Sequence, residues 1–399
     1  MSFGFKSSPF ESKTATKEKP DMWVPPGGFD RILEEPQTFL VFAPRGGGKT
    51  ACRRLLEYYC SPQMSGGDLR KVGNRVLAIP YTDFKEADER LQSNQGVEVT
   101  WHVEQILKQA AKRLVNYAYE NEKMGKQLRA AVQSLIPACQ QELFLILETH
   151  LSWESQIELL QNLFPEFIQD TDSLLPNLSP IAYLEHFIAL MCKGGNRGLG
   201  FSAVYILIDS LDQIYETADL SQDAIIQLTL PLITNRHLMC DIPQLAFKWF
   251  LPLEVKDRLM RNPGVNNSGL QVEEIQWFDW NIGDILQRRL RNHKRDENDA
   301  SFTHIEALCA PDLRGVIETL LFEMTNGNPR KVMHLCEYMI DAHTEILINH
   351  ATPDREESFL LNKSDWNIAK ERFEAKKKKS VSATQTTINV QGNGNVVGN

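Results

Sequence analysis

One glycine-rich run near the start of the chain has the residue types and spacing of a phosphate-binding loop. Residues 43–50 read A-P-R-G-G-G-K-T, the Walker A (P-loop) pattern with Ala43 where the first glycine usually stands. The three glycines allow successive backbone N–H groups to face phosphate oxygens, and the helix predicted over 49–59 presents its N-terminus to anions. We therefore expect a nucleotide site; the alternative is a chance glycine turn before a helix.

The chemistry of phosphates and magnesium assigns roles within this loop. Lys49 is expected to contact the β- and γ-phosphates, and the hydroxyl of Thr50 is expected to ligate Mg²⁺. The loop residues predicted to bind the nucleotide are Pro44, Arg45, Gly46, Gly47, Gly48, Lys49, Thr50 and Ala51.

Two carboxylates follow the most apolar run of the chain. Residues 203–213 read A-V-Y-I-L-I-D-S-L-D-Q, so that Asp209 comes directly after the run and Asp212 three residues later. Since Mg²⁺ prefers oxygen ligands, we expect Asp209 to be the metal ligand beside Thr50. Asp212 is the candidate to orient or deprotonate an attacking water; the alternative is an acid that stabilises a helix N-terminus.

Short apolar runs separated by helix-periodic segments must position these motifs. The runs at 38–43, 75–80, 203–208 and 245–253, with a fifth at 273–278, are typical of strands buried on both faces of a parallel sheet. The pattern predicts an α/β fold: a parallel-sheet P-loop NTPase core with a helical insertion and a C-terminal helical lid domain. The expected boundaries are an extended N-terminal arm at 1–35, the core at 36–280 with its insertion at about 85–200, the lid at 281–365, and a disordered or β-prone tail at 366–399.

Composition narrows the class of protein. With 399 residues, of which 42% are hydrophobic, the chain can bury two or three cores. A net charge of -9 repels nucleic acid overall, so a nucleic-acid partner is possible but not favoured. We find no apolar run of bilayer length and no signal-peptide pattern, and therefore expect a cytoplasmic protein without a membrane span. The seven cysteines are scattered singly, which favours reduced thiols over disulfides or structural zinc.

The order of these motifs resembles a known family. A Walker A loop, a helical stretch, LIDSLDQ, a later apolar strand and a helical region carrying GNPR resemble the STAND branch of AAA+-like P-loop ATPases over about residues 9–343. Its relatives include the NACHT and NB-ARC ATPases and, more distantly, the origin-recognition ATPases. The resemblance implies an ATPase that uses ATP and Mg²⁺, and the lack of a clear sensor-1 residue after the fourth strand implies slow turnover.

The resemblance also assigns roles in the lid. Gly327-Asn328-Pro329 matches a G-x-P motif that touches the adenine or ribose side of the nucleotide, so Pro329 joins the predicted binding residues. Arg330 is similar to a sensor-2 arginine that reaches the γ-phosphate; the alternative is a surface arginine at a helix start. Trp277 and Trp280 lie in the segment that resembles the family's link to the lid, and we expect both to pack rather than to stack on a base.

Several other arginines are candidates for an arginine finger. They are Arg45 in the loop and Arg288, Arg289 and Arg291 on one predicted helix, although arginines on a helix more often form a solvated face. The chain after His343 is too short for the complete winged helix of many STAND proteins.

The C-terminal residues T-T-I-N-V-Q-G-N-G-N-V-V-G-N carry no charged side chain and combine β-branched residues with Asn, Gln and Gly. They resemble the RHIM-like amyloid signalling motifs of some bacterial STAND proteins, with short strands expected at 388–391 and 395–397; the alternative is a flexible polar tail.

The leading hypothesis from the sequence is an ATP-dependent signalling switch. We expect it to form homo-oligomers and to signal to a downstream effector protein through the tail, in a role that the resemblance associates with bacterial antiphage defence. The alternatives are a DNA-associated ATPase of the origin-recognition kind and a phosphotransferase that acts on a small molecule.

Overall fold

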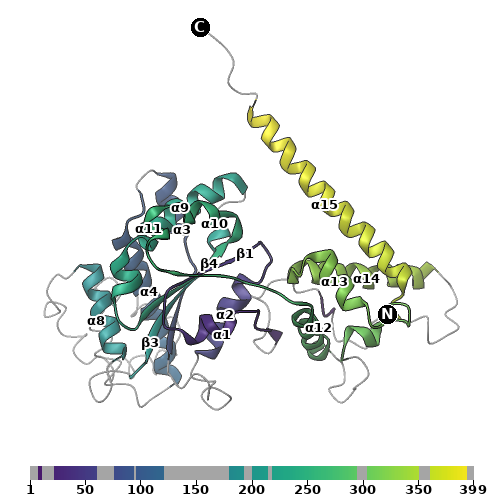
Figure 1. The fold of residues 1–399 in the computed structure, drawn as a ribbon, viewed down its shortest axis with the longest axis horizontal. Helices are drawn as coiled ribbons and strands as arrows, with labels where there is room; N and C mark the ends of the chain where they lie inside the picture. Colours follow the sequence, from purple (N-terminus) through teal and green to yellow (C-terminus); the bar gives the residue numbers. More distant parts are fainter. Residues whose placement is uncertain are drawn as a thin grey trace, which may run out of the picture. The chain divides into compact units, whose positions relative to one another are not determined.

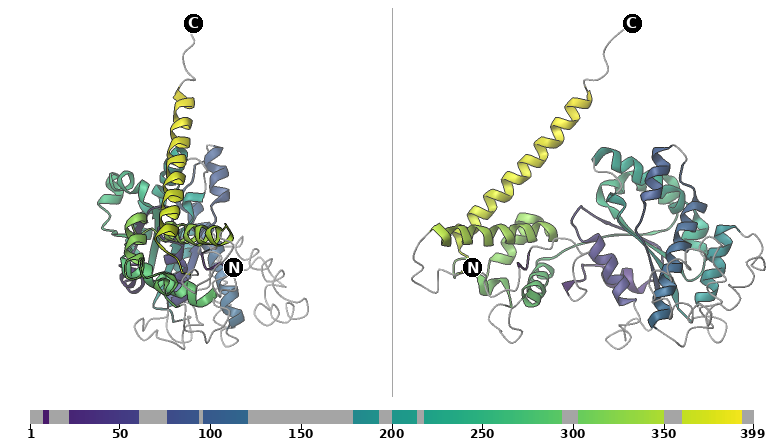
Figure 2. Two further views of the ribbon diagram at one scale, coloured as in Figure 1. Left: turned by 90° about the vertical axis from the view of Figure 1, so that its right-hand side faces the viewer. Right: turned by 180° about the vertical axis from the view of Figure 1, so that it is seen from behind.

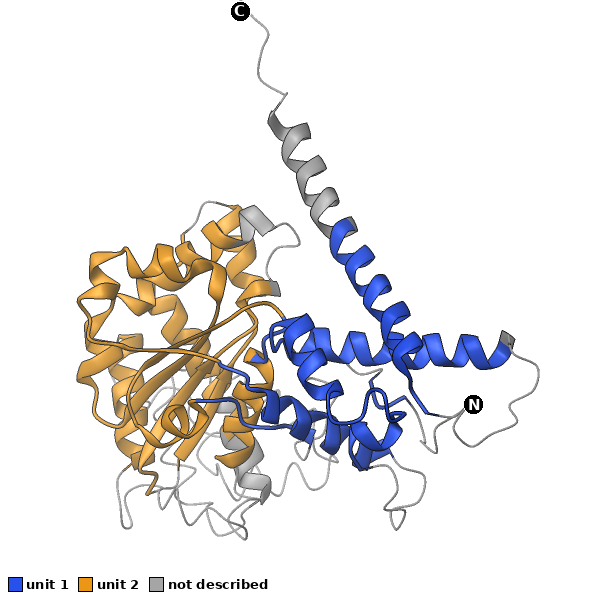
Figure 3. Cartoon of the chain, turned by 45° about the vertical axis from the view of Figure 1, so that its right-hand side comes forward, with its two compact units in different colours: residues 1–27, 46–48, 276–399 blue, residues 28–45, 49–275 orange. Residues whose placement is uncertain are grey.

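Figure 1 shows the computed structural model of the chain, which describes residues 8–10, 22–60, 76–93, 96–120, 179–192, 200–213, 218–293, 303–349 and 360–392. The chain forms two compact units (Figure 3). The sheet unit comprises Gly28–Arg45 and Lys49–Ile275, and the helical unit comprises Met1–Gly27, Gly46–Gly48 and Gln276–Asn399.

The sheet unit is built on five parallel strands. They are β1 (Phe39–Ala43), β2 (Val76–Tyr81), β3 (Ala203–Ile208), β4 (Leu245–Pro252) and β5 (Gln271–Glu274), arranged in the order β2-β3-β4-β1-β5. Almost every residue of the first four strands is buried, as expected for strands covered on both faces. The expected α/β class with a parallel sheet is confirmed. The fifth strand is wrong by a few residues, because the chain leaves the sheet after Glu274 rather than pairing as far as residue 278.

Helices cover both faces of this sheet. They are α1 (Phe29–Glu34), α2 (Lys49–Tyr59), α3 (Lys85–Gln92), α4 (Val99–Glu120), α8 (Pro180–Cys192), α9 (Ala218–Ile233), α10 (Lys256–Met260) and α11 (Pro263–Asn266), with short turns η6 (Leu211–Gln213), η7 (His237–Asp241) and η8 (Leu253–Val255). The connection from β1 to β2 crosses the sheet in the direction opposite to the later ones. Since such crossovers are right-handed, α2 lies on the opposite face from α4, α8 and α9.

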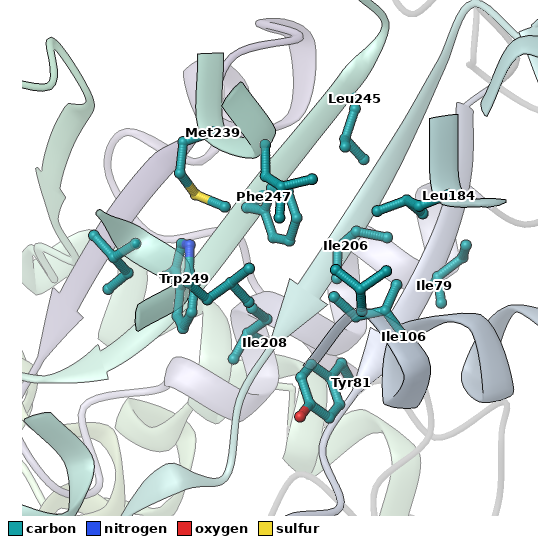
Figure 4. Packing of buried hydrophobic residues seen from close by; sticks show 14 of the residues in the cluster. Ile79, Tyr81, Ile106, Leu184, Ile206, Ile208, Met239, Leu245, Phe247 and Trp249 are labelled. Carbon is teal, nitrogen blue, oxygen red and sulfur yellow. The ribbon is translucent and has the colours of Figure 1, made fainter. Parts of the chain in front are cut away.

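Alternate residues of each strand point to opposite faces of the sheet. Figure 4 shows the core on one face, in which strand residues such as Ile206 and Phe247 pack with Ile106 of α4 and Leu184 of α8. The expected insertion at about 85–200 therefore contributes, through α3, α4 and α8, helices that cover the sheet. Residues 121–178 of that insertion lie outside the described residues.

The helical unit has a core of its own. Its helices are α12 (Asp279–His293), α13 (Ile317–Thr325), α14 (Pro329–Asn349) and α15 (Lys363–Gly392), with the short turn η9 (Ile305–Leu308). Phe10 and Val24 are buried in the same core, and the Nη1 of Arg289 donates to the carbonyl of Pro9 at 3.2 Å. The described part of the arm expected at 1–35 is thus packed on the helices of the helical unit, while residues 29–34 form α1 of the sheet unit.

The start of α15 is anchored in this core. Asn362 accepts hydrogen bonds from the N–H groups of Ser364 and Asp365, and Trp366 and Ala369 are buried against the helical core. Figure 2 shows this part of α15 beside α14. The tail expected from residue 366, with a strand at 388–391, is instead helical as far as Gly392. Capping at Asn362 and the Ala-, Lys- and Glu-rich turns that follow favour helix propagation. The second expected strand, at 395–397, lies outside the described residues.

None of the helices in the described ranges combines the length and the apolar character that crossing a membrane requires.

Candidate nucleotide site

The glycine-rich loop leaves the buried strand β1 and leads directly into α2. Gly46 and Gly48 have φ angles of 77° and 92°, in the left-handed region that favours glycine. The helix α2 then begins at Lys49. The local fold is thus the strand, turn and helix that a phosphate-binding loop requires. Pro44 and Arg45 are exposed at the start of the turn, and Thr50 and Ala51 are partly buried in the first turn of α2.

Lys49 turns its ammonium group toward its own loop and toward Asp212. Its side chain is 5% exposed, and its Nζ donates to the carbonyls of Ala43 at 3.2 Å and Pro44 at 3.4 Å. The Nζ also lies 3.5 Å from the Oδ2 of Asp212. The sheet unit therefore brings together two of the predicted residues, and Lys49 has protein acceptors that a phosphate group would have to replace.

Asp209 lies at the carboxyl end of β3 and is only 1% exposed. Its N–H donates to the carbonyl of Tyr81 at 3.3 Å, and the next residue, Ser210, has a φ of 72° that turns the chain out of the sheet. The Oδ2 of Asp209 accepts from the Nε of Arg53 at 3.2 Å. Its Oδ1 is buried without a hydrogen-bond partner among the described residues. A buried carboxylate oxygen in this condition is costly and calls for an explanation such as a bound cation or water.

The Oδ1 of Asp209, unpartnered within the described part of the chain, shows whether the residues of this site suit a bound Mg²⁺. The described residues contain no group of three His, Cys, Asp or Glu side chains that could hold a metal. Mg²⁺ bound with a nucleotide does not need one, because phosphate oxygens and waters complete its octahedron beside one or two protein oxygens. The Asp209 carboxylate fits that requirement.

Arg53 is a site residue that the sequence analysis missed. It is 8% exposed, and besides its bond to Asp209 its Nη1 donates to the Oε2 of Glu57 at 2.8 Å. Lys49, Arg53 and Glu57 are spaced at i, i+4 and i+8, so they share one face of α2. That spacing was the available signal, although on its own it is equally typical of a solvated helix face.

The neighbouring Cys52 is not a nucleophile in this site. Burial, together with the charge of Asp209, raises the pKa of its thiol far above the ordinary value. The thiol therefore stays protonated, and the chemistry of the site rests on oxygen and nitrogen groups.

Within the helical unit, the three loop glycines lie against Trp277 and Arg330. The Nε1 of Trp277 donates to the carbonyl of Gly47 at 2.8 Å. A Cβ atom on Gly48 would lie 2.6 Å from the Trp277 ring, and one on Gly46 would lie 3.0 Å from the Cβ of Arg330. The two glycines are thus required by close packing as well as by their backbone angles. Trp277 packs as expected.

The G-x-P segment forms the junction between α13 and α14. Asn326 and Gly327 have φ angles of 53° and 64° that end α13, and the Oδ1 of Asn328 accepts from the N–H of Lys331 at 3.2 Å. Pro329 is the first residue of α14, the helix position that proline suits best. Asn328 therefore caps the helix that places Arg330 beside Gly46.

Other predicted residues have different surroundings. Arg288 and Arg289 donate to the carbonyls of Trp23 at 2.5 Å and Pro9 at 3.2 Å, so both hold the N-terminal arm. Arg291 is exposed. Trp280 is 59% exposed and stacks on the exposed Phe278, so its packing is limited to a surface contact.

Comparison with known proteins adds no relative, since no protein-family model matches the chain and no curated protein matches it.

Proposed function

We propose that this chain is an ATP-binding P-loop protein of the STAND type that hydrolyses ATP slowly and acts as a nucleotide-dependent signalling switch. The observation that carries the proposal is the loop at 43–50, with left-handed Gly46 and Gly48 between a buried parallel strand and α2. The orphaned oxygen of Asp209 in the sheet unit supports a magnesium ion as part of the bound species. The STAND family is proposed because the order of the motifs resembles that of STAND ATPases.

Each site residue then has a stated task. Lys49 exchanges its loop carbonyls for β- and γ-phosphate oxygens, and Thr50 and Asp209 hold Mg²⁺. The metal, when bound with ATP, neutralises charge that develops on the phosphates. Asp212 loses its ion pair with Lys49 and accepts a hydrogen bond from the attacking water. Arg330, which lies beside Gly46 in the helical unit, responds to the γ-phosphate.

The test is nucleotide titration calorimetry with the parent, Lys49→Ala and Asp209→Ala proteins, followed by phosphate-release assays. We expect the parent to bind ATP and to release phosphate slowly. Lys49→Ala should weaken binding with or without Mg²⁺, whereas Asp209→Ala should weaken only the part of the affinity that depends on Mg²⁺. Absence of ATP binding by the folded parent would refute the proposal.

The proposed switch is tested by measuring the size of the protein particle in solution. We propose that ATP and Mg²⁺ promote a homo-oligomer, which then signals to an effector protein, and that the cellular role is antiphage defence. Light scattering with and without ATP and Mg²⁺ should show a larger particle only with both. A protein that stays monomeric in every condition would remove assembly from the proposal while leaving nucleotide binding intact.

The DNA-associated alternative receives less support. It requires a basic face, and two arginines of its main basic segment, Arg288 and Arg289, are engaged by the N-terminal arm.

A further inference from the structure

We infer that Arg53 is a positioning residue for the magnesium-binding carboxylate Asp209, and that Glu57 fixes Arg53 from the other side. The inference rests on the proposed function, because it concerns the metal that accompanies the nucleotide. It adds an outer pair of residues, on the second and third turns of α2, to the motif residues that the sequence indicates.

The geometry forms a chain of three charged side chains. The carboxylate of Glu57 accepts from the Nη1 of Arg53 at 2.8 Å, and the Nε of the same guanidinium donates to the Oδ2 of Asp209 at 3.2 Å. Both bonds start from one planar guanidinium, so the orientation of one carboxylate is linked to that of the other. The third partner, Asp209, is fixed at its own backbone by the bond of its N–H to Tyr81 and by the left-handed Ser210.

As a consequence, one carboxylate oxygen of Asp209 accepts a hydrogen bond from Arg53 and the other has no partner among the described residues. Arg53 holds Oδ2, so the carboxylate cannot rotate freely, and Oδ1 remains as the oxygen without a partner. Burying a carboxylate in this manner would be unfavourable for a purely structural ion pair, which gains most when both oxygens are satisfied. An arginine that fixes one oxygen and leaves the other open has the arrangement expected of an outer partner of a metal ligand.

Charge supports the same assignment. Along α2, Lys49 pairs with Asp212 and Arg53 pairs with Asp209, so each base of this helix face meets one acid of the LIDSLD segment. Lys49 is the base that phosphates would attract away from its partner. Arg53, one turn further along the helix, can keep its bond to Asp209 while the nucleotide is bound.

Outer partners of metal-binding carboxylates typically contribute a factor of about 10 to 100 in metal affinity. We therefore expect Arg53→Met to reduce the magnesium-dependent gain in ATP affinity by about 10- to 100-fold. The affinity for ATP in EDTA should change by less than about threefold, since Arg53 is not assigned a phosphate contact. Arg53→Lys should restore part of the magnesium effect, because an ammonium group can donate one bond but lacks the planar fork.

The experiment is titration calorimetry of ATP into each variant, once in EDTA and once over a series of Mg²⁺ concentrations. Glu57→Gln is the milder companion, because Glu57 is more exposed than its two partners and its loss only loosens Arg53. Arg31→Met is the matched control: Arg31 also bridges two carboxylates, those of Glu35 at 3.1 Å and Glu273 at 3.2 Å, but is not bonded to Asp209. It should behave like the parent.

A folded Arg53→Met protein with the parent's magnesium effect would overturn the inference and leave the proposed function standing. If Arg53→Met does not fold, Glu57→Gln and Arg53→Lys decide: an unchanged magnesium effect in both would equally overturn it. A parent protein that binds no ATP in either condition would refute the proposed function, and the inference with it.

Discussion

Lys248 provides a sharp test of the packing of the sheet unit. It lies in β4 on the same face as α1 and α2 and is fully buried. Its Nζ donates to the carbonyls of Glu35 at 2.6 Å and Gln37 at 2.8 Å, and lies 4.4 Å from the centroids of the rings of both Phe39 and Tyr205. Burial lowers the pKa of Lys248 from 10.5 to about 7.

The sign of the pH dependence follows from that lowered pKa. Between pH 7 and about 10.5 the unfolded chain holds a proton on Lys248 that the folded protein has released, so the free energy of unfolding rises with pH. Below pH 7 both states are charged, and the cost of burying the charge is present in full. Since one pKa unit is about 1.36 kcal/mol, the whole window is worth at most about 5 kcal/mol. The two carbonyls and two rings stabilise the ammonium group, so we expect roughly 2 to 4 kcal/mol.

The perturbation is Lys248→Met, and the assay is urea unfolding of both proteins at intervals from pH 6 to pH 10. The quantity to follow is the difference in unfolding free energy between the two proteins, since groups common to both cancel. We expect this difference to move in favour of the parent by roughly 2 to 4 kcal/mol as the pH rises. A difference between the two proteins that stays constant over this pH range would refute the reasoning.

Three further predictions concern the stability effects of His102, Gly48 and Asp365. Burial lowers the pKa of His102 from 6.5 to about 4, so stability should fall by about 3 kcal/mol as the pH drops from 7 to 4; His102→Asn should lack this loss in acid unfolding curves, and an equal loss would contradict it. Gly48→Ala should cost at least about 1 kcal/mol more than Gly200→Ala in urea, because both have positive φ but only a Cβ at Gly48 meets Trp277; equal costs would count against this contact. Asp365→Ala, which removes the acceptor of two hydrogen bonds at the start of α15, should cost about 2 to 4 kcal/mol in the same assay, and a neutral change would disprove the anchoring role.

The sheet could be predicted from the sequence because its strands are buried on both faces. The expected run at 203–208 coincides with β3, and the expected runs at 38–43, 75–80 and 245–253 differ from β1, β2 and β4 by one residue at one or both ends. Continuous apolar runs carry that signal. The edge strand β5 is only partly buried and contains Glu273 and Glu274, so its pattern is weak and its bounds were misplaced. Strand order depends on the direction of each crossover, which no local pattern records.

The motif residues could be predicted for a different reason, and their partners could not. A loop that needs left-handed backbone must use glycine, so Gly46 and Gly48 are visible in the sequence. Arg53 becomes visible only when β3 brings Asp209 to α2 from more than 150 positions away in the chain. The strand expected at 388–391 is wrong because the β-branched Thr, Ile and Val residues in and just before that stretch favour strands locally, whereas here they continue a helix that begins at a capped and buried start.

The most direct test of the account is the affinity of the folded chain for ATP, measured by titration calorimetry with Mg²⁺ present, for the parent and for Lys49→Ala. The account predicts saturable binding near one ATP per chain for the parent and binding at least about tenfold weaker for Lys49→Ala, since the variant lacks the ammonium group that meets the phosphates. Equal affinities for the two folded proteins, or no binding by the parent, would contradict it.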